Sequence, residues 1–162
     1  MEIRAMMGDI TQQETDAIIV NLFEEVTTPG GATESVDKAL DGVISELIND
    51  GEIKGKRGRM TLIHTLGKMT PSRVLVAGLG KKSEFSTDVV RSVSSECFRY
   101  LRRVGVESVA TVAHGAGIGK LGAMDSGQAI SEGSVLGLYQ FDKYKSLNNG
   151  QRKIKQLNVV EF

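Results

Sequence analysis

The fold class of this 162-residue chain is indicated most clearly by residues 73–113, RVLVAGLGKKSEFSTDVVRSVSSECFRYLRRVGVESVATVA. Their first part, residues 74–79, predicts a strand that Gly78 and Gly80 close. A helix is predicted over 86–104, because its apolar residues recur at helical spacing and Gly105 follows as a terminator. Residues 108–113 predict a further strand. Strands that alternate with helices in this way indicate an α/β domain.

The residues before this stretch continue the alternation. Strands are predicted at residues 2–7, 17–20 and 60–66. One helix is predicted between the second and third of these strands, since six apolar residues from Val36 to Ile48 lie on one helical face. Thr33 or Ser35 is expected to cap its start, and Gly51 its end. The alternation of strands and helices therefore extends to the N-terminus.

The residues after the deciding stretch add one helix and one strand. The helix is predicted at 126–139 and contains Gly133 and Gly137, each costing up to about 1 kcal/mol against Ala. Their four-residue spacing indicates that this helix packs closely against another backbone. Residues 155–162 predict the last strand. We expect one domain with a mixed, mostly parallel central sheet and no internal repeat.

Composition limits both the location and the partners of the protein. The chain has 20 basic and 20 acidic residues, and this balance argues against a dedicated nucleic-acid binder. Cys97 is the single cysteine, so no intramolecular disulfide forms and a reducing compartment is expected. The N-terminal residues lack the apolar run of a signal peptide, and no apolar stretch reaches membrane-spanning length. These features predict a cytoplasmic protein without a membrane partner.

The sequence predicts neither a metal site nor a catalytic residue. His64 and His114 are its only histidines, and neither has a partner at metal-ligand spacing. His64 is expected to be a structural histidine within a strand. His114 follows a strand at the edge where α/β proteins place ligands, so it is a candidate binding residue. Cys97 falls on the apolar helix face and is expected to be a buried, inert thiol.

A glycine-rich segment after the fifth strand is the strongest local motif. Gly117, Gly119 and Gly122 match the spacing G-x-G-x-x-G between a strand and a helix. Such glycines can bring backbone N–H groups to a pyrophosphate, or can simply let the helix pack closely on the sheet. Two basic clusters are candidates for contact with phosphates or an acidic partner. They comprise Lys54, Lys56, Arg57 and Arg59, and Lys143, Lys145, Arg152, Lys153 and Lys155.

Part of the pattern resembles the macro domain, a family that binds ADP-ribose. Gly8-Asp-Ile-Thr11 followed by Asp16-Ala-Ile-Ile-Val-Asn21 is similar to its opening, and Leu22-Phe-Glu24 departs from it. The resemblance implies an adenine contact from Asp9 and two phosphate loops. Under this interpretation the ligand-binding residues are Asp9, Asn21, Gly30, Gly31, His114, Gly115, Gly117 and Gly119. A stand-alone module that binds ADP-ribose or a related nucleotide is therefore one functional hypothesis.

A longer series of motifs resembles the N-terminal domain of the M17 leucyl aminopeptidases. The matching segments are GDI (8–10), DAIIVNLFE (16–24), GKRGRMTLIHTLG (55–67), RVLVAGLGKKSEFS (73–86) and EGSVLGLYQFDKYKS (132–146). The last segment is the most specific, and the resemblance covers residues 1–146. It implies a three-layer αβα macro-like fold over 1–146. It also implies that 147–162 form a linker and the first strand leading toward an absent catalytic domain.

The M17 resemblance implies a non-catalytic assembly or regulatory role. In that family a C-terminal domain binds two divalent metals, commonly zinc, manganese or magnesium, and releases N-terminal amino acids from peptides. Its metal-binding motifs have no counterpart in this chain. The implied partners are that C-terminal catalytic domain, further copies in a hexamer and, in some members, DNA.

Overall fold

The computed structural model describes residues 1–115, 121–140 and 152–161, which form an α/β domain. Its sheet has the order β1-β6-β5-β2-β4-β3, and only β3 is antiparallel to its neighbour. The prediction of a mixed, mostly parallel sheet is therefore confirmed. The strands are β1 (Glu2–Met7), β2 (Ala17–Phe23), β3 (Met60–His64), β4 (Arg73–Gly80), β5 (Ser108–Val112) and β6 (Gln156–Glu161).

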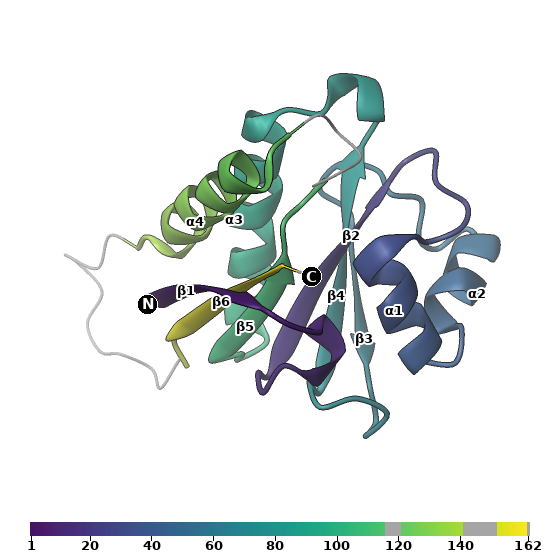
Figure 1. Cartoon of the computed structure of the whole chain (residues 1–162), viewed down its shortest axis with the longest axis horizontal. Helices are drawn as coiled ribbons and strands as arrows, with labels where there is room; N and C mark the ends of the chain where they lie inside the picture. Colours follow the sequence, from purple (N-terminus) through teal and green to yellow (C-terminus); the bar gives the residue numbers. More distant parts are fainter. Residues whose placement is uncertain (116–120, 141–151, 162) are drawn as a thin grey trace.

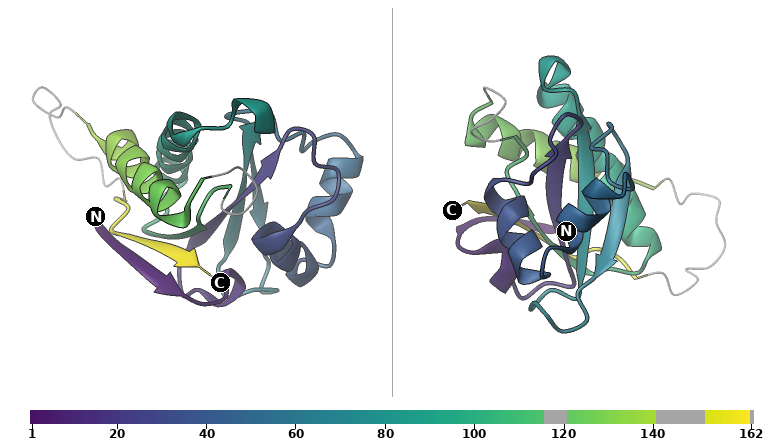
Figure 2. Two further views of the ribbon diagram at one scale, coloured as in Figure 1. Left: turned by 45° about the horizontal axis from the view of Figure 1, so that its top comes forward. Right: turned by 90° about the vertical axis from the view of Figure 1, so that its right-hand side faces the viewer.

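Helices cover the sheet from both sides and complete three layers, as Figures 1 and 2 show. On one face lie α3 (Thr87–Arg103) and α4 (Ala123–Leu138), and on the other lie α1 (Gly31–Ala39) and α2 (Val43–Asn49). Two short 3-10 helices, η1 (Ile10–Gln12) and η2 (Lys82–Glu84), follow β1 and β4. The three-layer αβα architecture that the M17 resemblance implies is confirmed.

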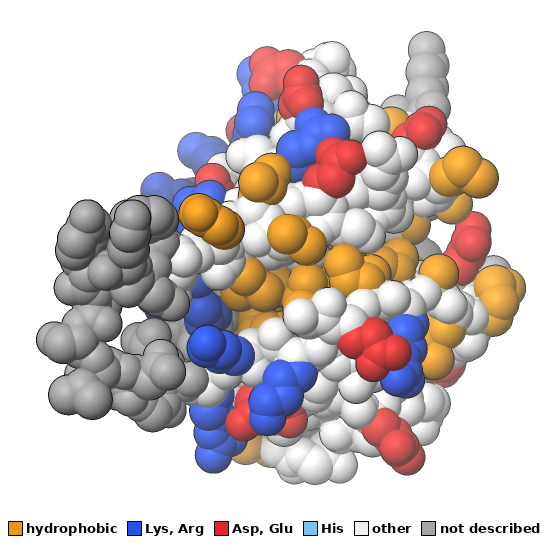
Figure 3. Space-filling view, turned by 90° about the vertical axis from the view of Figure 1, so that its left-hand side faces the viewer, with side chains coloured by type: hydrophobic (Ala, Val, Ile, Leu, Met, Phe, Trp, Pro, Cys, Tyr) orange, Lys and Arg blue, Asp and Glu red, His pale blue; other side chains and the backbone are white. Residues whose placement is uncertain are grey.

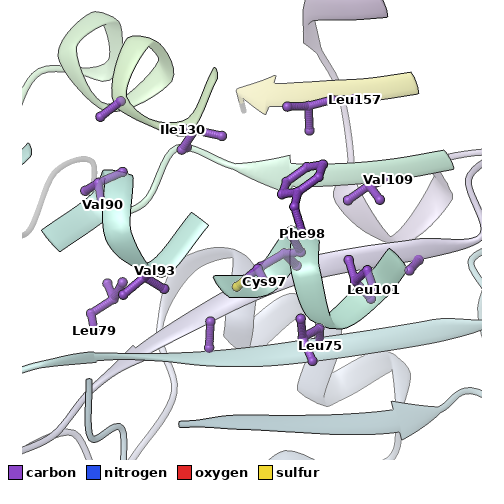
Figure 4. Packing of buried hydrophobic residues seen from close by; sticks show 14 of the residues in the cluster. Leu75, Leu79, Val90, Val93, Cys97, Phe98, Leu101, Val109, Ile130 and Leu157 are labelled. Atoms are coloured by element: carbon purple, nitrogen blue, oxygen red, sulfur yellow. The ribbon is translucent and has the colours of Figure 1, made fainter. Parts of the chain in front are cut away.

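The unbroken apolar runs of the central strands arise because both of their faces are buried. In β2, Ile19 belongs to the core beneath α3 and α4, whereas Ile18 belongs to the core beneath α1 and α2. Phe98 and Cys97 of α3 lie within the first of these cores, as Figure 4 shows. Alternate residues therefore anchor the two helical layers to one sheet.

Residues 31–49 form two helices, so the prediction of a single helix there is wrong. Asp41 and Gly42 adopt the left-handed region with φ of 58° and 85°, which ends α1 and redirects the chain into α2. The buried carboxylate of Asp37 accepts hydrogen bonds from the backbone N–H (3.0 Å) and the hydroxyl (2.5 Å) of Ser45. These bonds hold α2 against α1 across the break.

The predicted N-terminal cap, Thr33 or Ser35, is also wrong, because α1 begins earlier than expected. Gly30 is the N-cap, and no side chain caps it. Thr33 lies within the first turn, where its hydroxyl donates to the carbonyl oxygen of Asn21 at 2.8 Å. Ser35 bonds to the carbonyl of Gly31 at 3.4 Å. The hydroxyl of Thr33 thus ties the start of α1 to the end of β2. Gly51, by contrast, follows the C-cap of α2 with φ of 77°, as predicted for the end of the helical stretch.

Gly133 and Gly137 face the backbone of α3, which confirms the predicted close packing of their helix. A Cβ atom on Gly133 would overlap the carbonyl oxygen of Arg91 and lie 3.0 Å from its carbonyl carbon. A Cβ atom on Gly137 would overlap the carbonyl oxygen of Ser95 and lie 2.8 Å from its Cα. At these two positions of α4, the seam between the two helices has no room for a side chain.

Strand β6 lies between β1 and β5, parallel to both. Leu157 is opposite Ile3 on one side and Val109 on the other. Residues 156–161 are therefore an inner strand of this sheet and not a strand set apart from it. Where a following domain would begin stays a prediction.

Candidate functional site

A cleft opens where the carboxyl ends of β2 and β5 lie side by side. The chain leaves β2 toward α1 on one face of the sheet, and leaves β5 toward α4 on the other. Such a switch point separates the two connections and leaves a crevice above the strand ends, where open α/β sheets bind ligands. The cleft has a volume of about 290 Å³ and is lined by the ends of β2, β5 and β6 and by the start of α1.

Four of the predicted binding residues come together at this cleft. Asn21 belongs to β2, Gly30 and Gly31 begin α1, and Gly115 follows β5. They are separated widely in sequence and meet because β2 and β5 are neighbours. The structure thus supports one common location for these four residues, and their ligand-binding role stays a prediction.

The start of α1 lines the cleft with backbone N–H groups. The first N–H groups of an α-helix have no intrahelical acceptor, and they carry the positive end of the helix dipole. Gly30 offers no side chain to accept from them. Gly31, Ala32 and Thr33 of this first turn all line the cleft. The arrangement favours an anionic or carbonyl oxygen of a ligand at this end of the cleft.

Gly115 makes room for a pair of aromatic rings beside the cleft. Its φ is +70°, and a Cβ atom there would overlap the ring of Phe85. That ring packs edge to face on Phe23, with 5.0 Å between centroids and 81° between planes. Phe23 itself lines the cleft. A glycine at position 115 is thus required by packing, whatever ligand-binding role it has.

Asp9 does not line the cleft. Its carboxylate accepts hydrogen bonds from the backbone N–H and the hydroxyl of Thr11, both at 2.8 Å, and so caps η1. The structure therefore gives Asp9 a local role and does not bring it together with the other predicted binding residues.

His114 also lies outside the cleft lining and is fully buried. Its Nε2 is 3.0 Å from the hydroxyl of Thr111, and its carbonyl oxygen accepts a bond from Ser126 in α4. Burial lowers the pKa of the imidazole to about 4, so the ring is neutral near pH 7. His114 thus joins the end of β5 to α4. Gly117 and Gly119 lie outside the described residues.

Sequence reasoning missed the residues that β6 brings to the cleft. Val160 and Glu161 line it because β6 pairs with β5, which places Val160 opposite Val112. The prediction that residues 147–162 form a linker and a strand leading toward a catalytic domain does not connect them with a site in this domain. The apolar pattern of this segment was the available signal, since it matches a strand buried in a parallel sheet.

The first predicted basic cluster borders a second hollow, of about 370 Å³, against α3. Arg59 of the loop and Arg99 and Arg103 of the helix line this hollow, together with Glu96 and the ring of Tyr100. The guanidinium of Arg103 lies 5.7 Å from that ring. In the second cluster, Arg152 and Lys155 pair with Glu107, while Lys143 and Lys145 lie outside the described residues. The exposed arginines can contact an anionic partner.

The described residues do not fit a metal centre. Within residues 1–115, 121–140 and 152–161, no three His, Cys, Asp or Glu side chains gather to hold an ion. His64 is exposed at the end of β3, so its predicted structural role is wrong. Cys97 is fully buried, and burial raises the pKa of its thiol. No helix among the described elements has the length and apolar character that a bilayer crossing requires.

Comparisons with known proteins agree along nearly the whole chain. The profile described as "Cytosol aminopeptidase family, N-terminal domain" matches residues 19–148. A probable cytosol aminopeptidase of Alkaliphilus metalliredigens is 34% identical over 94% of this chain and 30% of its own length. A relative from Alkaliphilus oremlandii is 31% identical over 99% of this chain and 32% of its own length. The chain thus spans about a third of the length of these curated relatives.

Solved structures show the same fold at low sequence identity. A tomato leucine aminopeptidase mutant superposes with a TM-score of 0.79 at 18% identity, over 98% of this chain and 32% of that one. A Trypanosoma brucei macrodomain, solved in complex with ADP-ribose, gives 0.73 at 14% identity over 98% and 63% of the two chains. Since the family profile covers most of the chain, the protein belongs to the cytosol aminopeptidase family as its N-terminal, macrodomain-like domain.

Proposed function

We propose that this chain is the non-catalytic assembly or regulatory domain of a leucyl-aminopeptidase-like metallo-exopeptidase. The observation that carries the proposal is the extent of the match. The alignments cover 94–99% of this chain, yet only 30–32% of the length of the first two relatives. A chain that spans about a third of its relatives' length supplies one domain, and the catalytic residues belong to the rest of the parent protein.

The parent protein would release N-terminal amino acids from peptides with divalent metals, zinc, manganese or magnesium, held in its C-terminal catalytic domain. We place it in the cytoplasm and assign it a hexameric assembly. DNA contact, which some members of the family make, would use the hollow lined by Arg59, Arg99 and Arg103. Such binding must weaken as salt rises. No shift of a DNA fragment in a low-salt gel would remove DNA from the list of partners.

The natural reading frame tests the proposal. We expect it to continue beyond Phe162 for roughly 300 residues, enough for a second domain, and to contain paired carboxylates and lysines. The product of that frame should hydrolyse leucyl substrates in a metal-dependent way. A frame that stops near Phe162 in the native gene would contradict the proposal.

A second candidate function is binding of ADP-ribose or a related nucleotide at the switch-point cleft. The uncapped first turn of α1 favours it, because phosphate oxygens bind at such helix starts. Asn21, Gly30, Gly31 and Gly115 line the cleft. This function is compatible with the first, since it would make the domain a ligand-responsive part of a larger enzyme.

Calorimetry with ADP-ribose tests the second candidate through two variants. Gly30→Asp places a carboxylate at the N-cap, where a Cβ atom has no neighbour within 4 Å. The change should stabilise α1 while repelling a phosphate, so binding should disappear without loss of folding. Asp9→Ala should reduce binding only if Asp9 holds the adenine. Absence of heat with the unaltered chain at high-micromolar ADP-ribose would end this candidate.

A further inference from the structure

An open apolar groove runs between β1 and α4, on the face shown in Figure 3. Its volume is about 700 Å³. Ile3, Ala5 and Met7 contribute from β1, and Met124 and Gly127 contribute from the facing side of α4. Met7 is 70% exposed and Met124 is 85% exposed. Figure 3 shows hydrophobic side chains gathered along this band, with charged groups at its rims.

Two features show that this face lacks a covering layer. First, all six residues of β1 are exposed, although β1 pairs in parallel with β6 and parallel strands are normally covered on both faces. Second, α4 carries exposed apolar side chains at Met124 and Val135, while its opposite side packs on α3 through Gly133. A helix that is apolar on both sides normally lies between two partners.

We propose that this groove is the docking site of a helix formed by the polypeptide immediately after β6 in the parent protein. The inference rests on the proposed function, in which a further domain follows this one. Glu161, at the end of β6, itself lines the groove, so a continuing chain starts at its mouth. Helices cover both faces of the sheet's inner strands. A further helix along β1 would complete the layer that α3 and α4 form.

The dimensions of the groove fit a short helix. The six residues of β1 extend over roughly 20 Å at about 3.3 Å per residue. A helix rises about 1.5 Å per residue, so about 13 residues cover that length. Gly127 has open space around a Cβ position, and Ser131 beside it is small, so a helix can approach α4 closely there. The occupant should present apolar residues toward Ile3 and Met124.

Hydrogen–deuterium exchange on three proteins tests the proposal. They are the 162-residue chain, the chain extended by about 25 residues of its natural reading frame, and the complete product. We expect amides of β1 and of the outer side of α4 to exchange at least about tenfold more slowly in both longer proteins. Equal exchange in all three, or protection only in the complete product, would overturn the proposal. So would protection of β1 that rises with concentration of the 162-residue chain, since a second copy would then be the occupant.

A matched pair of variants adds a thermodynamic readout. Met124→Asp should lower the thermal midpoint of the extended chain and leave that of the 162-residue chain unchanged, because the side chain is buried only when the groove is filled. Leu66→Asp is the control, since Leu66 is 88% exposed and lies in the β3–β4 connection. An equal effect of Met124→Asp in both proteins would contradict the proposal. The proposed function fails separately if the complete product shows the protected groove but lacks peptidase activity.

Discussion

Replacing Gly133 with alanine should destabilise the domain, although alanine is the better helix former. The change gains up to about 1 kcal/mol of helix propensity. The new methyl group would overlap the carbonyl oxygen of Arg91 and come within 3.0 Å of the Cβ atom of Ser94. Ordinary carbon contacts begin near 3.5 Å, so α4 must move away from α3 by roughly 1 Å.

The steric cost of that movement exceeds the gain in propensity. Overpacking of a close interface typically costs about 1–3 kcal/mol, and the helices also lose contact along the seam. Because the neighbour is backbone, no side-chain rotation relieves the overlap. We expect Gly133→Ala to lower the free energy of unfolding by about 1–2 kcal/mol.

Gly127→Ala, in the same helix, is the matched control. A Cβ atom there meets nothing within 4 Å, so only the propensity gain remains. This variant should raise the free energy of unfolding by up to about 1 kcal/mol. Urea denaturation of the 162-residue chain, followed by far-UV circular dichroism, measures both. If Gly133→Ala were as stabilising as Gly127→Ala, the close-packed seam between α3 and α4 would be refuted.

Three further predictions concern groups whose environment differs between the folded and unfolded chain. Burial lowers the pKa of His114 to about 4, so between about pH 6.5 and 4 only the unfolded chain takes up this proton. The free energy of unfolding should fall across that range by up to about 3 kcal/mol as pH decreases, and His114→Gln should flatten the slope; an unchanged slope in that variant would contradict the prediction. Cys97 should react with iodoacetamide only as fast as the protein unfolds, and fast labelling under native conditions would show that its thiol is accessible. Asp16→Ala should lower the free energy of unfolding, measured by urea denaturation, by about 1.5–3 kcal/mol. The reason is that the Asp16 carboxylate accepts hydrogen bonds from the backbone N–H of Glu107 (2.8 Å) and of Ser108 (3.0 Å). A change below about 0.5 kcal/mol would show that these bonds are dispensable.

The elements of the fold were predictable wherever periodicity alone decides them. The helix from Thr87 to Arg103 matches its prediction within one residue at each end, because Ser86 caps it and Gly105 follows it. The break at Asp41 was not predictable from periodicity, since the apolar spacing continues through it. Only the left-handed backbone of Asp41 and Gly42 separates the two helices. Asp37 is buried and accepts a hydrogen bond from the second helix, which the apolar spacing does not reveal.

The candidate site was predictable only in part, because it depends on strand order. Motif positions predicted Asn21 and Gly115, which the pairing of β2 with β5 brings together. The contribution of Val160 required knowing that the last strand enters between the first and the fifth. The burial of His114 was not predictable, because position after a strand does not reveal whether a side chain points to the crevice or into the protein.

We propose that this domain is part of a metal-dependent peptidase and has no peptidase activity of its own. Hydrolysis of leucyl p-nitroanilide tests that claim, with manganese added to the purified 162-residue protein and, in parallel, to the product of the complete reading frame. We predict metal-dependent release of p-nitroaniline by the complete product and none above the buffer rate by the 162-residue protein. Metal-dependent release by the 162-residue protein alone, abolished by a chelator, would contradict the claim.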